Sequence, residues 1–237
     1  MSDPYTRLEN ARELCACGRP DRARALLKAS VPPSLAAERL LIMGEALRGQ
    51  GYFGRAGDAY RAALKRVDTQ DRDLVFDAWL GLARCQRSLG ATAEARRSLA
   101  RARRIPGADR ATVALEDALV LRAESRHRPA LKALRPMLAA SRRQRDWSAV
   151  GFMLWAIAGS RRFSGDLAGS HRDFKESLSS FRRADDAEGE AYAQFGLGGI
   201  ARIRGRFQEA RRAYIDAGKL LKGGPDLFGR AYADAGN

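Results

Sequence analysis

The sequence predicts an all-α protein made of about six helix–turn–helix units and a terminal half-unit. Three observations predict this fold. A glycine recurs at intervals of 33 to 40 residues in most units, small and large residues recur at fixed distances from it, and no stretch alternates polar and apolar residues as a strand would. A single helix pair buries too little apolar surface to be stable alone, so the units must stack on one another.

The recurring glycine is expected to end the first helix of each unit. Glycine adopts the left-handed conformation of a helix end at little steric cost. Ser125 takes this place in the fourth unit. The glycines are Gly18, Gly51, Gly90, Gly165 and Gly205.

Three columns of residues flank this turn at helical spacing. Seven residues before it the residue is small: Ala11, Gly44, Ala83, Ala118, Ala158 and Gly198. Five residues after it the residue is again small: Ala23, Ala56, Ala95, Ala130, Ser170 and Ala210. Nine residues after it the residue is large: Leu27, Tyr60, Leu99, Leu134, Phe174 and Tyr214. Small residues facing large ones allow two antiparallel helices to approach closely and interlock.

These columns resemble the tetratricopeptide repeat family, whose pattern is W-x2-L-G-x2-Y…A-x3-F…P. The third unit matches it with Trp79, Leu82, Ala95, Leu99 and Pro106. The resemblance covers nearly the whole chain. It implies a right-handed superhelical solenoid whose first helices line a concave groove.

We therefore expect residues 1–237 to form a single solenoid. The expected repeats are 4–36, 37–75, 76–110, 111–150, 151–190 and 191–228, followed by a half-repeat at 229–237.

The resemblance places the residue three before each turn in the groove. Five successive units carry arginine there, an arginine ladder of Arg48, Arg87, Arg122, Arg162 and Arg202. In the fifth and sixth units an aromatic–aromatic–glycine–arginine pattern recurs after forty residues: Phe152, Trp155, Gly159 and Arg162, then Tyr192, Phe195, Gly199 and Arg202. A glycine beside the rings would leave a hollow for a ligand side chain that ends in an acidic or amide group. The alternative is that the rings are core and the arginines are solvated surface.

The segment Gly196–Ala201 also fits the G-x-G-x-x-G/A pattern of dinucleotide-binding loops. No strand precedes it, and the repeat pattern puts it inside a helix. A phosphate needs the free N–H groups of a helix N-terminus, and those of a helix interior are already bonded. We therefore expect these glycines to serve packing and not a nucleotide.

The net charge of +15 favours an acidic partner. The function that fits best is a non-catalytic scaffold that binds an acidic and apolar segment of a protein partner in the groove. One alternative is single-stranded RNA or DNA held by the arginine ladder. The other is that the chain is one arm of a larger regulatory or signalling protein.

Catalysis, cofactors and metals find no support in the sequence. Cys15, Cys17 and Cys85 have neither zinc-site spacing nor the even number of a disulfide framework. His127 and His171 stand in arginine-rich stretches near the start of second helices, where surface positions are expected. No signal peptide or membrane-spanning segment is recognisable, so we expect a cytoplasmic protein that does not associate with membranes.

The last residues look like the first half of a seventh unit. Leu227, Phe228, Ala231 and Tyr232 fall at helical spacing. One face of such a helix would have no second helix to meet it. We expect either that the chain continues or that this helix forms a homodimer with a second copy.

Overall fold

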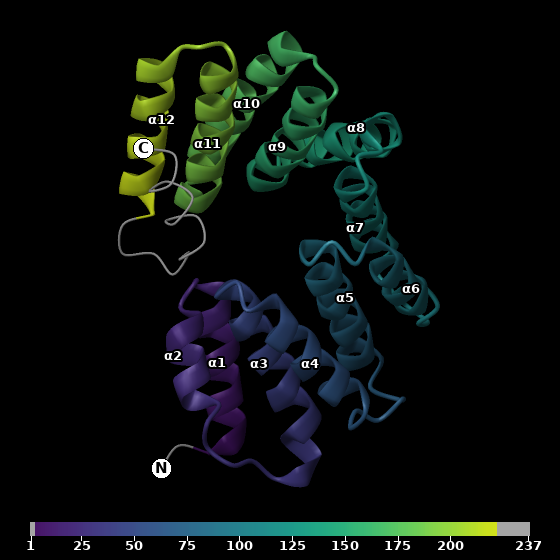
Figure 1. Cartoon of the computed structure of the whole chain (residues 1–237). Coiled ribbons are helices and arrows are strands. Elements are labelled where there is room, and N and C mark those ends of the chain that lie inside the picture. The colour runs from purple at the N-terminus through teal and green to yellow at the C-terminus, as the bar shows by residue number, and fades with distance from the viewer. Residues whose placement is uncertain (1–2, 222–237) are drawn as a thin grey trace. The chain divides into compact units, whose positions relative to one another are not determined.

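The computed structural model describes residues 3–221, which form twelve α-helices and one 3-10 helix and contain no strand (Figure 1). This confirms the predicted all-α fold. The helices are α1 (Pro4–Ala16), α2 (Pro20–Leu26), η1 (Pro33–Leu35), α3 (Ala36–Gly49), α4 (Phe53–Leu64), α5 (Arg72–Ser88), α6 (Thr92–Arg103), α7 (Arg110–Ala123), α8 (His127–Gln144), α9 (Trp147–Phe163), α10 (Leu167–Arg183), α11 (Ala187–Ile203) and α12 (Phe207–Leu220).

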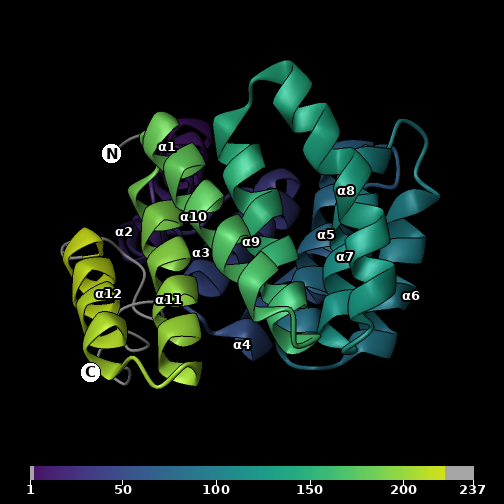
Figure 2. The same cartoon turned by 90° about the horizontal axis from the view of Figure 1, so that it is seen from above.

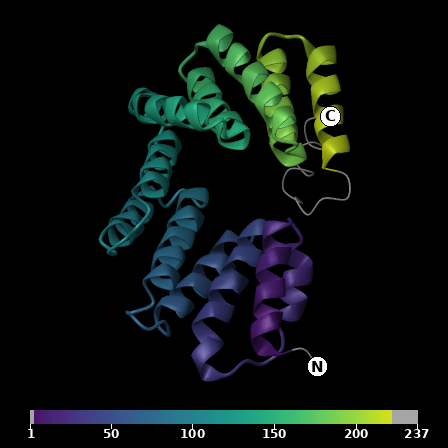
Figure 3. The same cartoon turned by 180° about the vertical axis from the view of Figure 1, so that it is seen from behind.

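The chain forms two compact units, residues 1–120 and 121–237, and the boundary between them falls within α7. In the first unit, α1 packs on α2, α3 on α4 and α5 on α6. In the second unit, α9 packs on α10 and α11 on α12, and the pairs are joined by contact between α10 and α11. The pairing of α11 with α12 can be followed from three sides (Figure 1, Figure 2 and Figure 3).

The turns within the repeats have the predicted backbone conformation. The five column glycines have φ values from 68° to 86°, in the left-handed region. Ser125 has the same conformation with φ of 58°, which confirms its place in the glycine column. Arg145 and Asp185 also have positive φ, at the turns that lead into α9 and α11. The sequence indicates polar loops there, at residues 141–146 and 182–190, but not their left-handed conformation, because neither residue is a glycine.

The packing columns are buried as predicted. The large residue nine positions after the turn is at most 6% exposed in every repeat. Small residues make room for it. A Cβ added at Gly44 would lie 2.8 Å from the Tyr60 ring, and one added at Gly198 would lie 2.8 Å from the Tyr214 ring. Glycine and alanine therefore set how closely the paired helices approach.

Several first helices start at an aspartate N-cap, and they start earlier than the expected repeat boundaries. Asp71, Asp146 and Asp186 each precede a first helix, and each carboxylate accepts the backbone N–H three residues on. These caps satisfy N–H groups that the helix itself leaves unpaired. As a result α5, α9 and α11 begin four residues before the repeat starts expected at 76, 151 and 191.

The expected end of the sixth repeat, the half-repeat at 229–237 and the homodimer through Tyr232 lie outside the described residues.

Candidate functional site

Aromatic rings from α9 and α11 form a continuous row in the second unit. Phe152 and Trp155 have ring centroids 5.8 Å apart, Trp155 and Tyr192 are 6.1 Å apart, and Tyr192 and Phe195 are 6.0 Å apart. Phe195 also contacts Tyr214 of α12, at 6.4 Å. These spacings are typical of favourable aromatic pairs. The structure thus brings together the four aromatic residues singled out in the sequence, which we call the aromatic row.

The rings of the row belong partly to the core and partly to the surface. Phe152, Trp155 and Tyr192 are half-buried, whereas Phe195 is buried. Trp155 packs against the buried Phe174, so part of its ring fills the space between helices. The alternative of a core role therefore describes part of these side chains, and the ligand surface stays a prediction. Three rings keep exposed area that a partner could contact.

Arg122 lies over the Trp155 ring. Its guanidinium carbon is 4.5 Å from the ring centroid, a cation–π contact. Arg122 belongs to α7 and Trp155 to the next first helix, α9. A Cβ at Gly159 would stand 3.6 Å from the Arg122 Nη1. A methyl group at Gly159 would be in ordinary van der Waals contact with this guanidinium, so the arginine of the preceding repeat lies directly beside the glycine.

The same arrangement recurs one repeat later. A Cβ at Gly199 would lie 2.6 Å from the Nη1 of Arg162. The expectation of open hollows above Gly159 and Gly199 is therefore corrected: a guanidinium occupies this space in each case. The reason is that a long arginine side chain reaches from one first helix across the next. This reach becomes visible only when the helices are placed side by side. We call Arg122–Gly159 and Arg162–Gly199 the arginine–glycine steps.

The arginines of the first unit have different surroundings. Glu116 is only 4% exposed and accepts a hydrogen bond from Arg84 at 2.7 Å. It also pairs with Arg87 at 3.4 Å. Arg48 lies beside the hydroxyl of Tyr60, whose pKa is raised by burial although the guanidinium opposes the shift. The predicted arginine ladder is thus a set of different contacts, and Arg202 at the end of α11 is exposed.

Sequence reasoning missed Glu116 as the partner of Arg87 of the ladder and of Arg84. The available signal was an acidic residue on a helix face that is otherwise apolar. A buried carboxylate of this kind is tolerated when cations and hydrogen bonds compensate its loss of water.

The glycines of Gly196–Ala201 lie in the middle of α11, as expected. A Cβ at Gly196 would overlap the Phe174 ring, one at Gly198 would meet Tyr214, and one at Gly199 would meet the Arg162 guanidinium. Each glycine thus allows a close approach by a large side chain. The segment therefore shares the sequence pattern of a dinucleotide-binding loop but not its structure.

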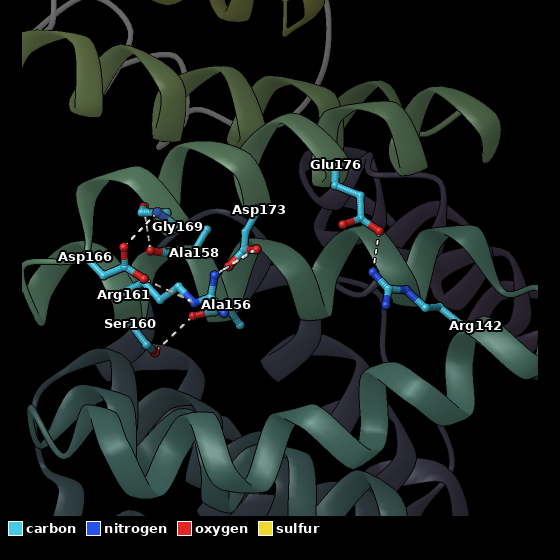
Figure 4. A network of polar contacts seen from close by, with 10 residues as sticks. Arg142, Ala156, Ala158, Ser160, Arg161, Asp166, Gly169, Asp173 and Glu176 are labelled. Carbon is cyan, nitrogen blue, oxygen red and sulfur yellow. Dashed lines mark hydrogen bonds and ion pairs between the residues drawn. The ribbon is translucent and has the colours of Figure 1, made fainter.

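A polar network joins α10 to α9, the helix that carries Trp155 (Figure 4). The Ser170 hydroxyl donates to the Ala158 carbonyl at 2.7 Å. Arg161 pairs with Asp173 at 3.2 Å and with Asp166 at 3.7 Å. Burial raises the pKa of Asp173, and the charge of Arg161 opposes that rise. These contacts hold the helix that carries half of the aromatic row.

The three cysteines are free thiols with different surroundings. Cys17 is exposed, whereas burial raises the pKa of both Cys15 and Cys85 to about 11. At pH 7.5 a thiol of that pKa is ionised in about one molecule in three thousand. We expect a disulfide reagent to modify Cys17 first and Cys85 only when the protein opens, as followed by mass spectrometry over time. Fast modification of Cys85 in the folded protein would contradict this.

Within residues 3–221, no group of three or more His, Cys, Asp or Glu side chains is arranged to hold a metal ion. None of the helices in this range has the length and apolar character needed to cross a membrane.

The chain matches a known family of repeat proteins. A model of the tetratricopeptide repeat matches residues 41–109 and 164–225, which together make up more than half of the chain. The chain belongs to the tetratricopeptide repeat family. None of the curated protein sequences compared with it matches.

Solved structures share the fold of this tetratricopeptide repeat protein at low sequence identity. The structure of NprR in complex with its cognate peptide NprX has a TM-score of 0.72 and 13% identity, over 96% of this chain and 71% of NprR. The structure of a Rap protein complexed with Competence and Sporulation Factor has a TM-score of 0.63 and 16% identity, over 92% of this chain and 76% of the Rap protein.

A third similar structure belongs to a larger protein. The signal transduction ATPase PH0952 from Pyrococcus horikoshii, which has a tetratricopeptide repeat sensor, gives a TM-score of 0.56 and 16% identity. The match covers 99% of this chain and 39% of the ATPase.

Proposed function

We propose that this tetratricopeptide repeat protein is a non-catalytic scaffold that binds an acidic and apolar segment of a protein partner on its second unit. The binding surface would consist of the aromatic row and the two arginine–glycine steps. The observation that carries the proposal is the contact of Arg122 with Trp155, at 4.5 Å. It places a fixed cation against a partly exposed ring.

The chemistry of this surface supports such a ligand. Half-buried rings offer apolar area that loses little conformational freedom on binding, which is why Trp, Tyr and Arg are enriched at the centres of interfaces. A guanidinium offers several N–H donors in a fixed plane and binds a carboxylate through two of them. A peptide with an aromatic or aliphatic side chain next to Asp or Glu would match both features.

The similar structures point toward a peptide or protein ligand. NprR was solved with its cognate peptide NprX, and the Rap protein was solved with Competence and Sporulation Factor. Tetratricopeptide repeat proteins are generally scaffolds without catalytic activity. At 13 to 16% identity these relatives share the fold, so the nature of the ligand here remains our proposal.

The ATPase comparison favours a second possibility, that the chain works as the sensor arm of a larger regulatory protein. This chain spans only 39% of that ATPase. Such an arm would use the same surface to detect its ligand. The alternative of nucleic acid along the arginine ladder has less support, because buried Glu116 already pairs with Arg87.

The proposal is tested by selecting peptides from a random twelve-residue phage library on the full chain. We expect enriched peptides to combine Asp or Glu with an aromatic or aliphatic residue. The variant Gly199→Leu tests whether selected peptides bind this surface. Its leucine side chain would displace the flexible Arg162 guanidinium and cover part of the surface. Selected peptides should bind this variant at least tenfold more weakly, as measured by calorimetry. Enriched peptides without acidic residues, or unchanged affinity for Gly199→Leu, would contradict the proposal.

A further inference from the structure

A second surface, rich in exposed apolar side chains and arginines, lies at the turns between the paired helices of the second unit. Among the described residues of this unit, Phe163 is 65% exposed, Ile203 is 52% exposed and Phe207 is 69% exposed. Phe163 ends α9, Ile203 ends α11 and Phe207 begins α12. Large apolar side chains with this exposure, gathered at neighbouring turns, often mark a site of interaction.

Contacts between the turns show that they lie along one edge. The Arg204 side chain donates to the Leu167 carbonyl at 3.2 Å, which joins the α11–α12 turn to the start of α10. The His127 ring at the start of α8 stacks on Phe163, with ring centroids 5.7 Å apart and planes inclined by 12°. The loop between α11 and α12 lies at the upper end of these helices in Figure 1. We call residues 126–128, 161–167 and 203–212 the turn edge.

The turn edge carries more cations than anions. Its carboxylates are Asp166, which pairs with Arg161 at 3.7 Å, and Glu209, which pairs with Arg206 at 3.5 Å. The adjoining Glu124 pairs with Arg126 at 3.7 Å. The arginines of the edge are Arg126, Arg128, Arg161, Arg162, Arg204, Arg206, Arg211 and Arg212. The field of this edge is therefore positive.

The protonation of a nearby histidine is consistent with that field. Burial lowers the pKa of His171, and the charges of Lys175 and Arg204 lower it further. Arg206 acts in the same direction, and Glu209 opposes it.

An open pocket of about 690 Å³ lies on this edge at the start of α12. Its lining combines the Phe207 ring, the guanidinium groups of Arg206 and Arg212, the Gln208 amide and the Glu209 carboxylate. A nucleotide has groups that match each of these. Its base can stack on the ring, its phosphate can pair with a guanidinium, and its base edge can exchange hydrogen bonds with an amide and a carboxylate.

We propose that the turn edge binds single-stranded nucleic acid, with a base stacked on Phe207 and phosphates paired with Arg204, Arg206 and Arg212. Phe163 is not assigned a base, since His127 stacks on its ring and the Arg162 guanidinium lies 4.9 Å from the ring centroid. The residues assigned to the base and the phosphates lie outside the arginine ladder and outside the surface proposed for peptides; the turn edge shares only Arg162 with them.

An anionic lipid surface would also attract the arginines, but it offers no planar ring to stack on Phe207. A base offers such a ring, and its amino group can donate to the Glu209 carboxylate.

The test measures fluorescence anisotropy of a labelled, mixed-sequence twelve-nucleotide RNA titrated with the full chain at several salt concentrations. We expect Phe207→Ala to weaken binding at least tenfold, since stacking of a base contributes substantially to affinity. Arg206→Glu/Arg212→Glu should weaken binding and flatten the plot of log affinity against log salt by about 1.4, which corresponds to two phosphate contacts.

Two controls separate this site from non-specific attraction and from the peptide surface. Arg66→Glu/Arg97→Glu makes the same charge change at exposed positions of the first unit and should leave at least half of the affinity. Trp155→Ala should leave RNA affinity unchanged. Melting curves check that each variant is folded. Absence of RNA binding at moderate salt, or equal losses in the two charge-reversal variants, would overturn the proposal. Phe207-dependent binding to phosphatidylserine vesicles without RNA binding would also overturn it.

Discussion

Gly196→Ala is expected to destabilise the protein by about 1–3 kcal/mol, which is the usual cost of forcing an extra methyl group into a packed core. The added Cβ would lie no more than 2.5 Å from three atoms of the Phe174 ring. Phe174 is 2% exposed and packs against Ala158 and Ile200, so its ring has no free space to move into. The better helix propensity of alanine recovers about 1 kcal/mol at most.

Thermal denaturation followed by circular dichroism measures this effect. For a chain of this size, each kcal/mol corresponds to a shift of about 2–4 °C in Tm. Gly54→Ala is the matched control, because no atom lies within 4 Å of a Cβ added in that position of α4. It should keep or slightly raise Tm. If both variants melt together with the wild type, the close contact of α11 with Phe174 is wrong.

Trp155→Ala is expected to weaken binding of the selected peptide by about 30-fold or more, which corresponds to about 2 kcal/mol for a buried aromatic at the centre of an interface. The substitution removes both the ring that a ligand would contact and the ring on which Arg122 rests. Calorimetry of the purified variant with the synthetic peptide gives the change in affinity.

Two further variants make this result interpretable. Trp147→Ala removes a tryptophan at the other end of the same helix, where it contacts Arg183, and should bind the peptide as the wild type does. Because Trp155 also packs in the core, Trp155→Leu keeps apolar volume while it removes the ring face. Equal losses in Trp147→Ala and Trp155→Ala would point to a general effect on α9 and not to a binding site.

The repeating fold could be predicted because its determinants are local. The turn conformation at Gly90 and its equivalents follows from the lack of a side chain, and the buried columns follow from helical spacing. Even Ser125 could be placed by its spacing alone. Aspartate caps such as Asp71 were not used, and three first helices begin four residues before the expected repeat starts.

The surroundings of the groove arginines could not be predicted from periodicity. Arg87 and Arg122 hold the same position in the repeat, yet one pairs with a carboxylate and the other rests on an indole. The difference depends on what the neighbouring first helix offers, Glu116 in one case and Trp155 in the other. A long side chain reaches this partner across a helix–helix contact, and a single repeat contains no information about that contact.

The central claim, that a peptide binds beside Trp155, is tested most directly by making this residue the sole tryptophan. The double variant Trp79→Phe/Trp147→Phe reports on Trp155 alone, and Trp79→Phe/Trp155→Phe reports on Trp147 alone. On titration with the selected peptide, Trp155 emission should shift to shorter wavelength as water leaves the ring, and it should saturate at the Kd found by calorimetry. Trp147 emission should stay constant at peptide concentrations that saturate this second variant by calorimetry. A peptide that binds with the same Kd while Trp155 emission does not change would contradict the proposed site.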